Sequence, residues 1–521
     1  MTRSVIDPLT RIEGHLRVEV EVEAGVVTDA WVSGTLYRGM ESVLHGRRPQ
    51  DAFYISQRIC GVCPISHGHA STMSAEAAMG IQIPEGARLV RNIIEGAQFL
   101  HSHILWFYTL GALDYVSPLK ALSANIADTY ALAQAAGTRV CDFGAVAKRL
   151  AAFVENGQLS IFTNGWLEHP EFAQDMPAEL HLIAVAHYLE ALEMQGEATA
   201  IIAIMGGKFP HYMTSVNGGT TFVPTEEKLD DVMFRLMKVN AFVREALIPD
   251  TLAIAPYYKA ALTFGGGGGN FLSWGVFNDP SFEMNNRYLP AGFSEGASLK
   301  VEDTDVDNVA EYTKHSWYSS PSGLNPKVGE TVAEYKDYNV DDKYSWGKAV
   351  RYKELPAEVG PLSRMVVAYL RGVKPVQALI DSTLAALGAP GKPEVLVSLL
   401  GRVAARNLEA AYVADLTEQF LNELVAAIKG GGDLKFFQPH DVVDGEGVGL
   451  WEAPRGSVAH YMTIKGGRID RYNVVAPTTW DIAPRDDNGV RGPMEQALIG
   501  TPVEEVERPM NVVRVARSFD P

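Results

Sequence analysis

Four long segments with apolar, helix-like patterning constrain the fold of this chain more than any other feature of its sequence. They span residues 87–115, 178–205, 227–248 and 393–430. Helices of this length bury their apolar stripes most readily against one another. The glycine run at 430–432 follows the last segment and is typical of a helix C-terminus. The pattern therefore predicts a central bundle of long helices.

Both ends of the chain show the two-residue periodicity of half-buried strands instead. Residues 16–23 alternate between apolar and charged side chains, and Ala24-Gly25 provides a turn into VVTDAWVSG. A second hairpin is predicted for 459–475, with Gly466-Gly467 at its turn. We therefore expect an α+β fold that is mainly α, with small β-hairpins or sheets from the N- and C-terminal regions around the bundle.

No internal repeat divides the chain, and we expect one intertwined unit over residues 1–521. Its expected parts are an N-terminal β region at 1–50, the helical bundle at 51–260 and 360–430, a loop-rich insertion at 261–359, and a C-terminal β/helix region at 431–521 that closes the active site.

Charge and composition exclude several classes of protein. The formal net charge is −18, whereas a nucleic-acid binder needs a basic face, so no nucleic acid is expected as a partner. Three cysteines in 521 residues exclude a disulfide scaffold. We expect no secretory signal and no membrane span, because the N-terminus lacks an apolar core and no apolar run reaches the roughly 18 residues of a span.

The stretch RICGVCPISHGH carries the clearest chemical signal. Cys60 and Cys63 stand two residues apart, with His67 close downstream. Metal ligation is the leading interpretation, although these three residues fall short of the four ligands of a structural zinc site. A thioredoxin-like redox pair or simple burial of two thiols remain as alternatives.

Short motifs elsewhere add candidate polar groups. TRIEGH places Glu13 beside an arginine and a histidine, and EAPRGS puts Arg455 directly after a proline, which stiffens the backbone that presents it. VVAPTTW puts Thr478 and a second hydroxyl after another proline. Taken singly, each has a structural explanation: a salt-bridged carboxylate, a surface arginine and a turn residue.

Together and in this order, these motifs resemble those of the large subunit of uptake-type NiFe hydrogenases. The resemblance runs from Ile6 to Pro521 and rests on DPLTRIEGH, YRGMESVLHGRRPQDA, RICGVCPISH, HSHILWFYTLGALD, GGKFPH, EAPRG, APTTWDIAPRD and RSFDP. It implies the hydrogenase large-subunit fold and an oxidoreductase that cleaves H2 heterolytically into protons and electrons.

The resemblance implies a NiFe(CN)2(CO) cluster held by four cysteine thiolates, which are soft ligands suited to a late transition metal. Cys60 would be a terminal nickel ligand and Cys63 a bridging one. The family's second cysteine pair follows an Asp-Pro dipeptide, and the sequence ends with that dipeptide. The second pair is therefore expected just beyond Pro521.

The resemblance also assigns roles around the cluster. Glu13 would be the first proton carrier, and Arg455 would lie over the open coordination position and act on H2 as a base or an electrostatic aid. Further implied residues are Glu41 and the backbone carbonyl of Val474 as magnesium ligands, His67 as a hydrogen-bond donor to a bridging sulphur, Asp520 as the group that fixes Arg455, Pro454 and Thr478 against the diatomic iron ligands, and Val62 and Leu110 along the gas channel.

Ser102 departs from the family's pattern. Many relatives have an aspartate in this H-D-H motif, where the chain reads His101-Ser102-His103. One carboxylate partner of Arg455 is thus replaced by a hydroxyl. We expect an altered rate or inhibitor response and not a loss of function.

The electrons must leave through another chain. Iron–sulphur clusters are generally held by four cysteines each, two of the three cysteines are assigned, and Cys141 is interpreted as a buried structural thiol. An obligate small subunit with the iron–sulphur clusters is therefore implied, which would pass electrons to a membrane or soluble acceptor. Membrane association through partners is expected, with a cytoplasmic location as the alternative.

Three other functions remain open at this point. One is an H2-sensing regulatory subunit with the same site. Another is a metal-free subunit like that of respiratory complex I, which shapes a quinone site and would apply if the second cysteine pair is truly absent. A thiol–disulfide oxidoreductase is the simplest alternative for Cys60 and Cys63.

Overall fold

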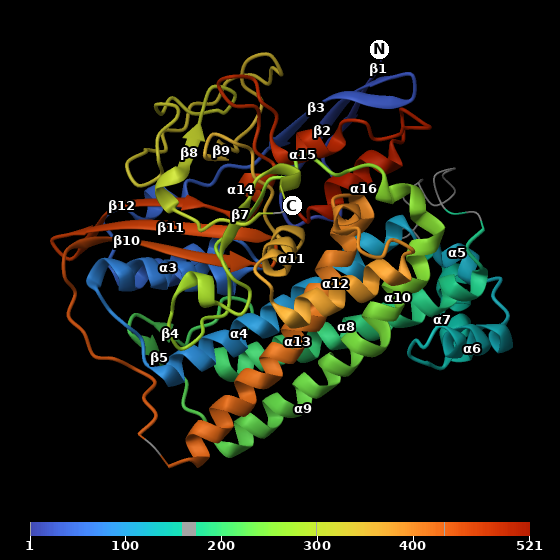
Figure 1. The fold of residues 1–521 in the computed structure, drawn as a ribbon, viewed down its shortest axis with the longest axis horizontal. Coiled ribbons are helices and arrows are strands. Elements are labelled where there is room, and N and C mark those ends of the chain that lie inside the picture. Colours follow the sequence, from blue (N-terminus) through green and yellow to red (C-terminus); the bar gives the residue numbers. More distant parts are fainter. Residues whose placement is uncertain (1, 159–172, 174, 299, 432) are drawn as a thin grey trace.

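Four long helices cross the centre of the molecule (Figure 1). The computed structural model describes residues 2–158, 173, 175–298, 300–431 and 433–521. The long helices are α4 (Glu85–Ile104), α8 (Ala178–Gly206), α9 (Glu226–Phe242) and α13 (Leu399–Lys429). Helices α4 and α9 each pack against both α8 and α13. The predicted bundle is confirmed; residues 159–172 and 174 of its predicted range lie outside the described residues.

Three of these helices differ in extent from the predicted segments. The third segment, 227–248, continues past the end of α9 at Phe242 as a π-helical turn, η5 (Val243–Leu247). The first segment continues past α4 as a π-helical turn, η2 (Leu105–Gly111), and a short 3-10 turn, η3 (Ala112–Asp114). The last helix begins at Leu399 and not at residue 393. Pro393–Leu396 forms a separate 3-10 turn, η10, and the Ser398 hydroxyl caps α13 by accepting a hydrogen bond from the Gly401 N–H at 3.0 Å.

The N-terminal sheet is covered by the last part of the chain. Strands β1 (Thr2–Ile6), β2 (Leu16–Glu23) and β3 (Val26–Gly34) form an antiparallel sheet in that order, so the predicted hairpin gains a third strand. Its apolar face packs with residues of α15 (Pro493–Leu498) and α16 (Met510–Ser518) in one cluster. Figure 1 shows the blue and red ends of the chain side by side.

The C-terminal sheet lies directly on a helix. Strands β10 (Gly445–Ala453), β11 (Gly456–Lys465) and β12 (Arg468–Val475) are antiparallel, and they pack on α3 (Pro64–Met79). A Cβ atom at Gly447 would lie 2.2 Å from the Ser74 carbonyl oxygen, and one at Gly449 would lie 1.9 Å from that of Ala70. The alternate glycines of β10 therefore allow strand and helix backbones to touch.

The loop-rich part contains two small sheets. Strand β6 (Phe271–Ser273) pairs with β7 (Gly292–Ser294), and β8 (Val309–Tyr312) pairs with β9 (Ala349–Tyr352). Their buried side chains share a cluster with those of β10, β11 and β12. The segment is thus a packed layer over the C-terminal sheet.

Shorter elements connect these parts. They are α1 (Met40–Leu44), α2 (Pro49–Ser56), η1 (Gln57–Ile59), α5 (Pro118–Ala121), α6 (Ile126–Ala135), α7 (Phe143–Glu155), β4 (Ser215–Val216), β5 (Gly219–Thr220), α10 (Ile248–Ile254), α11 (Pro361–Leu370), α12 (Lys374–Ala386) and α14 (Pro477–Asp481). None of the helices in the described ranges is long and apolar enough to cross a membrane.

Candidate active site

The two cysteines of the C-x-x-C motif lie where η1 meets α3. Pro64 occupies the first turn of α3 with Cys63 as its N-cap residue. Cys60 and Cys63 are joined by a disulfide, with their Cα atoms 5.5 Å apart. The Cys63 N–H also donates to the Cys60 Sγ at 3.0 Å. The two sulphur atoms therefore lie next to each other. A redox pair and a pair of ligands to one metal both require this arrangement.

Glu13 reaches this point from the loop between β1 and β2. Its Oε1 accepts a hydrogen bond from the Gly61 N–H at 3.1 Å and lies 3.9 Å from the Cys60 Sγ. The Glu13 N–H donates to the Pro521 carbonyl oxygen at 3.2 Å. Glu13 and Gly61 are exposed, whereas Cys63 is buried, so one side of the site opens to the surface.

Arg455 is buried at the turn between β10 and β11. Its Nη1 donates to the Ser102 hydroxyl at 3.2 Å, and its Nη2 donates to the Asp520 Oδ1 at 2.8 Å. Burial raises the pKa of Asp520, against the opposing effect of the Arg455 and Arg406 guanidinium groups. Arg455 thereby joins Ser102, which is 353 positions earlier in the chain, to Asp520 near the end of the sequence.

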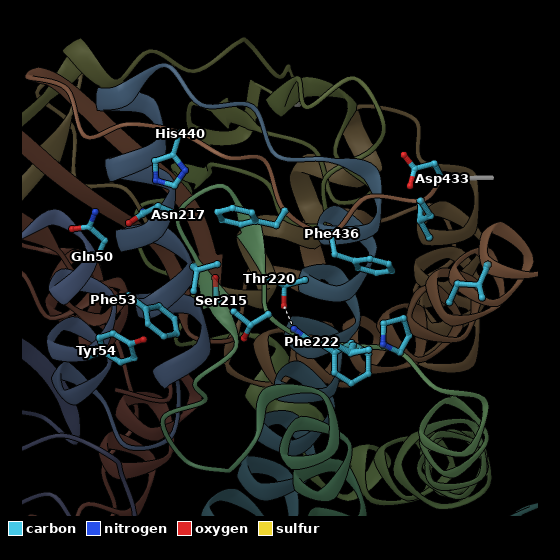
Figure 2. A pocket seen from close by; sticks show the side chains of 17 residues that line it. Gln50, Phe53, Tyr54, Ser215, Asn217, Thr220, Phe222, Asp433, Phe436 and His440 are labelled. Atoms are coloured by element: carbon cyan, nitrogen blue, oxygen red, sulfur yellow. Dashed lines mark hydrogen bonds between the residues drawn. The ribbon is translucent and has the colours of Figure 1, made fainter. Parts of the chain in front are cut away.

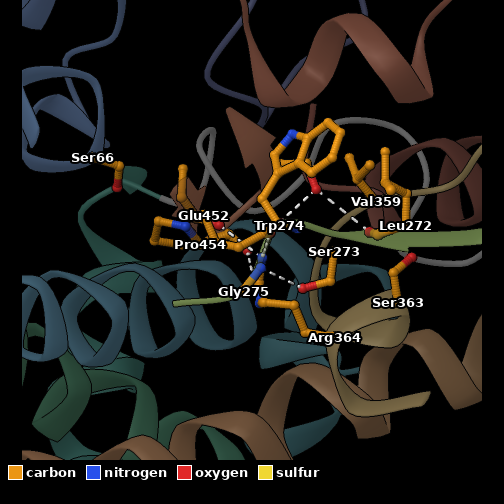
Figure 3. A network of polar contacts seen from close by, with 12 residues as sticks. Ser66, Leu272, Ser273, Trp274, Gly275, Val359, Ser363, Arg364, Glu452 and Pro454 are labelled. Carbon is orange, nitrogen blue, oxygen red and sulfur yellow. Dashed lines mark hydrogen bonds and ion pairs between the residues drawn. The ribbon is translucent and has the colours of Figure 1, made fainter. Parts of the chain in front are cut away.

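Arg364 supports the segment that presents Arg455 and was not found from the sequence. It lies in α11, and its Nη2 donates to the Pro454 carbonyl oxygen at 2.7 Å. Its remaining donors pair with the buried carboxylates of Glu409 and Glu452. Figure 3 shows Arg364 beside Glu452 and Pro454. An arginine inside a helix gives no sequence signal for such a role.

Arg406 is a second residue that sequence reasoning missed. Its Nη2 donates to the Ser518 carbonyl oxygen at 3.0 Å. Its Nε and Nη1, the Nε of Arg455 and the Oδ2 of Asp520 are buried without hydrogen-bond partners in the described structure. Burial lowers the pKa of Arg406 to about 10. The buried guanidinium groups of Arg406 and Arg455 carry two positive charges near the single carboxylate of Asp520. A further anionic group bound nearby would balance the remaining charge.

His67 lies on α3, one turn after Cys63. Its Nδ1 is 3.0 Å from the Nε2 of His460. Burial lowers the pKa of His67 to about 3, so the ring is neutral at physiological pH. His460 on β11 therefore sets how the ring of His67 is turned.

The two residues expected to bind magnesium are adjacent. The Glu41 Oε1 accepts a hydrogen bond from the Val474 N–H at 2.9 Å. Glu41 belongs to α1 and Val474 to β12. Across the described ranges, no group of three or more His, Cys, Asp or Glu side chains is arranged to hold a metal ion.

The remaining predicted residues make none of these polar contacts with their side chains. Thr478 is in the first turn of α14, and Val62 stands between the two cysteines, partly buried. Leu110 is in η2, where its carbonyl oxygen accepts a hydrogen bond from Arg11 at 2.6 Å. Cys141 is half-buried and not fully buried as expected, and its Sγ lies 3.5 Å from the Glu190 Oε2.

A separate cavity of about 940 Å³ lies between α2, the β4–β5 hairpin and residues 433–440 (Figure 2). Aromatic side chains such as Phe53, Phe222 and Phe436 line it. It contains none of the candidate site residues.

Known proteins similar to this chain match it over nearly its whole length. Residues 38–521 match the family model described as nickel-dependent hydrogenase, and residues 3–33 match a HoxL-like model. The chain is 38% identical to the Hydrogenase-2 large chain of Escherichia coli (strain K12), over 100% of this chain and 96% of that protein. It is 37% identical to the uptake hydrogenase large subunit of Rhodobacter capsulatus, over 100% of this chain and 94% of that protein.

Solved structures show the same fold. A reduced, active form of the Ni-Fe-Se hydrogenase from Desulfomicrobium baculatum has a TM-score of 0.83 to this chain at 34% identity, and the match covers 100% of this chain and 99% of that one. The Ni-Fe-Se hydrogenase from D. vulgaris Hildenborough in the reduced state has a TM-score of 0.82 at 35% identity, with 100% and 98% covered.

Proposed function

Since this chain belongs to the nickel-dependent hydrogenase family and is a hydrogenase large catalytic subunit, an oxidoreductase, we propose that it oxidises H2 with a nickel–iron cluster bound at Cys60 and Cys63. The observation that carries the proposal is the convergence of these two sulphur atoms with the Glu13 carboxylate. The comparisons support this function over the H2-sensing and metal-free alternatives.

The donor set around the cysteines fits the cluster. Cys60 and Cys63 supply two thiolates, and we propose that the second pair follows Pro521. The N–H groups of Glu13 and Gly14 donate to the Pro521 carbonyl oxygen at 3.2 and 3.3 Å, so a residue after Pro521 would lie close to Cys60. The unpaired N–H groups of Arg406 and Arg455 suit a cluster made anionic by thiolates and cyanide.

When bound, the cluster supplies a Lewis acid that makes H2 acidic enough for heterolytic cleavage and takes up its electrons. Glu13 then carries the proton away, because its carboxylate lies 3.9 Å from the Cys60 Sγ and is exposed on its other side. Ser102 and Asp520 hold the guanidinium of Arg455 in one orientation. At the buried side of the site, this positive charge then aids the cleavage of H2 electrostatically.

Further roles are proposed for the surrounding residues. Oxygen ligands suit magnesium, and Glu41 with the Val474 carbonyl would bind it. His67 would donate a hydrogen bond to a bridging sulphur. Pro454 and Thr478 would contact cyanide and carbon monoxide ligands of iron, and Val62 and Leu110 would line the path of the gas.

A small subunit with iron–sulphur clusters is proposed as the obligate partner. Two of the three cysteines are assigned to nickel, and Cys141 alone is too few for a cluster that generally needs four. The small subunit would cover the open side of the site, where Glu13 and Gly61 are exposed. Electrons would pass through it to a membrane or soluble acceptor. Association with a membrane would depend on these partners.

The first test measures the intact mass, nickel and iron of the natively purified complex, beside its rate of H2 oxidation. We expect about one nickel per chain, and a mass that includes two further cysteines beyond Pro521. A complex without nickel that does not oxidise H2 would refute the proposed function.

Glu13→Gln tests the proton carrier. The variant keeps the shape of the side chain and its acceptor oxygen for the Gly61 N–H, but it cannot take up a proton. We expect turnover to fall at least about 100-fold while nickel content is retained. Undiminished exchange of H2 with solvent deuterons in this variant would remove Glu13 from the proton route.

A further inference from the structure

A buried line of hydrogen bonds runs from His67 away from the cysteines. The Nδ1 of His67 is 3.0 Å from the Nε2 of His460, and the Nδ1 of His460 is 2.6 Å from the Tyr472 hydroxyl. The hydroxyls of Tyr472 and Ser71 are 2.7 Å apart. All four residues are at most 3% exposed. Tyr472 and Ser71 carry no role in the site described above.

The packing of β11 and β12 on α3 creates this line. His67 and Ser71 are one turn apart on the same face of α3, while His460 lies on β11 and Tyr472 on β12. The close approach of β10 to the helix brings the whole sheet within hydrogen-bond distance. The four groups are therefore fixed by backbone geometry.

The line does not lead to solvent. Around Tyr472 lie the buried hydroxyls of Ser56 and Ser74, and beyond them apolar side chains of α1, α3 and the sheet, including Leu44, Met79 and Ile464. A proton that reached Ser71 would enter this apolar cluster. The line is thus suited to orienting His67 and not to carrying protons out of the protein.

The protons of the line are interdependent. The facing nitrogens of His67 and His460 are 3.0 Å apart in a buried contact, so one of the two must lack a proton. A neutral imidazole donates from one nitrogen and accepts at the other. If the Nε2 of His67 is protonated, its Nδ1 must accept from His460, whose own Nδ1 must then accept from Tyr472. In the opposite order, His67 donates from its Nδ1 to His460, and His460 donates to Tyr472, so the Nε2 of His67 carries no proton. Only these two arrangements satisfy every link.

Serine hydroxyls beside Tyr472 select between the two arrangements, with Ser71 at 2.7 Å and Ser56 and Ser74 as further hydrogen-bond partners of Tyr472. The only hydrogen-bond partner of the Ser71 hydroxyl in the described structure is Tyr472. If Ser71 donates to Tyr472, then Tyr472 donates to His460 and every hydroxyl proton is used. In the opposite order the buried Ser71 proton has no acceptor, which is unfavourable.

We propose that Ser71, Tyr472 and His460 are positioning residues that fix the tautomer of His67, so that its Nε2–H faces the active-site sulphur atoms as a hydrogen-bond donor. This inference rests on the proposed function, which places His67 beside a bridging sulphur. Partners behind a residue that contacts a metal site commonly set its orientation and basicity.

Tyr472→Phe tests the inference, with Tyr461→Phe as the matched control. Tyr461 is also buried, lies next to His460 on β11, and its hydroxyl has no hydrogen-bond partner in the described structure. The readouts on the purified complex are nickel content, the infrared stretching bands of the iron-bound cyanide and carbon monoxide, and kcat for H2 oxidation.

We expect Tyr472→Phe to keep its nickel, to shift the infrared bands to lower wavenumber, and to lose about 10-fold in kcat. The bands move because a sulphur that loses a donor leaves more electron density on iron. Tyr461→Phe should match the unmodified enzyme in all three readouts. Bands and kcat unchanged in Tyr472→Phe would overturn the inference.

His460 provides a second comparison that decides the question if Tyr472→Phe fails to assemble. His460→Gln can donate to His67 and accept from Tyr472 in the same order, whereas His460→Leu can do neither. We expect the glutamine variant to keep the infrared bands near their original positions and the leucine variant to shift them. Equal bands in both would overturn the inference, whereas an unmodified complex without nickel or bands would instead refute the proposed function.

Discussion

Two buried glutamates show how neighbouring side chains decide the charge of the same residue type. Glu95 accepts hydrogen bonds from the neutral groups of Ser66 and Gln98, and burial raises its pKa to about 8. Glu409 is equally buried, but against that burial its ion pair with Arg364 lowers its pKa to about 2. Glu95 is therefore mostly protonated at neutral pH, and Glu409 is ionised.

Glu95 should make stability fall as pH rises. Between its ordinary pKa of about 4.3 and its folded value of about 8, the folded chain keeps a proton that the unfolded chain releases. The free energy of unfolding therefore decreases with increasing pH over this window. Glu95→Gln should flatten that decrease, measured as melting temperature from pH 5 to pH 8. Parallel curves for both proteins would contradict the assignment.

Glu409→Gln is the opposite case. It removes the charge that pairs with Arg364 and that is hydrogen-bonded by His103, so it should lower the melting temperature at pH 7. The two variants together separate the effect of burial from the effect of an ion pair.

Ser102 should tune the site through Arg455. Ser102→Asp would place a carboxylate beside the Arg455 Nη1, which now donates to the serine hydroxyl at 3.2 Å. We expect a measurable change in the rate of H2 oxidation or its inhibition, because a second carboxylate would neutralise a buried guanidinium. Ser102→Asn adds similar volume without charge and should change the kinetics less. Identical kinetics for Ser102→Asp and the unmodified enzyme would exclude this role.

Among the elements, the long helices could be predicted and some strands could not. The apolar periodicity of α8 extends over 29 residues and predicts its bounds to within one residue. Strand β10 was missed because its sequence, GEGVGLWEA, places glycines where an alternating strand has apolar side chains. Those glycines face α3 and not a layer of side chains, so the usual strand signal is absent.

The glycines of β10 should be intolerant of substitution. Gly449→Ala would place a methyl group 1.9 Å from the Ala70 carbonyl oxygen, which forces the sheet away from α3. We expect a loss of about 3 kcal/mol in the free energy of unfolding. Gly196→Ala is the control, because Gly196 lies inside α8 with open space around its Cα.

At position 196 an alanine should stabilise the protein by about 1 kcal/mol through its higher helix propensity. Urea-induced unfolding of both variants measures the difference. A neutral Gly449→Ala would show that the sheet can move off the helix at little cost.

For the molecule as a whole, the sequence could predict the motifs of the site but not all of its contacts. Cys60, Glu13 and Arg455 stand in recognisable motifs. The supporting residues Arg364 and Arg406 lie in stretches of α11 and α13 that are buried on nearly every side. Their roles depend on backbone carbonyls that are 90 and 112 positions away. Periodicity reports which face of a helix is buried, but it does not report which distant loop that face meets.

The two ends of the chain are tied together by Arg517. Its Nη1 donates to the Asp114 Oδ1 at 2.7 Å, and its Nε donates to the Thr10 carbonyl oxygen at 2.8 Å. Arg517→Met should cost about 3 kcal/mol of unfolding free energy, because it removes one partner of a buried ion pair. Arg48→Met removes an exposed partner of Asp51 and should cost at most about 1 kcal/mol. Equal costs in urea-induced unfolding would contradict the importance of burial here.

The covering of β2 and β3 by α15 and α16 has a consequence for biosynthesis. Strand β3 ends at residue 34, and α15 begins at residue 493. At about 5–20 residues per second, roughly 20–90 s of translation separate these elements. During that time Leu16, Val18 and Val20 lack the helices that finally bury them, so a cell that makes this chain must keep the nascent N-terminal sheet from aggregating until the last helices leave the ribosome.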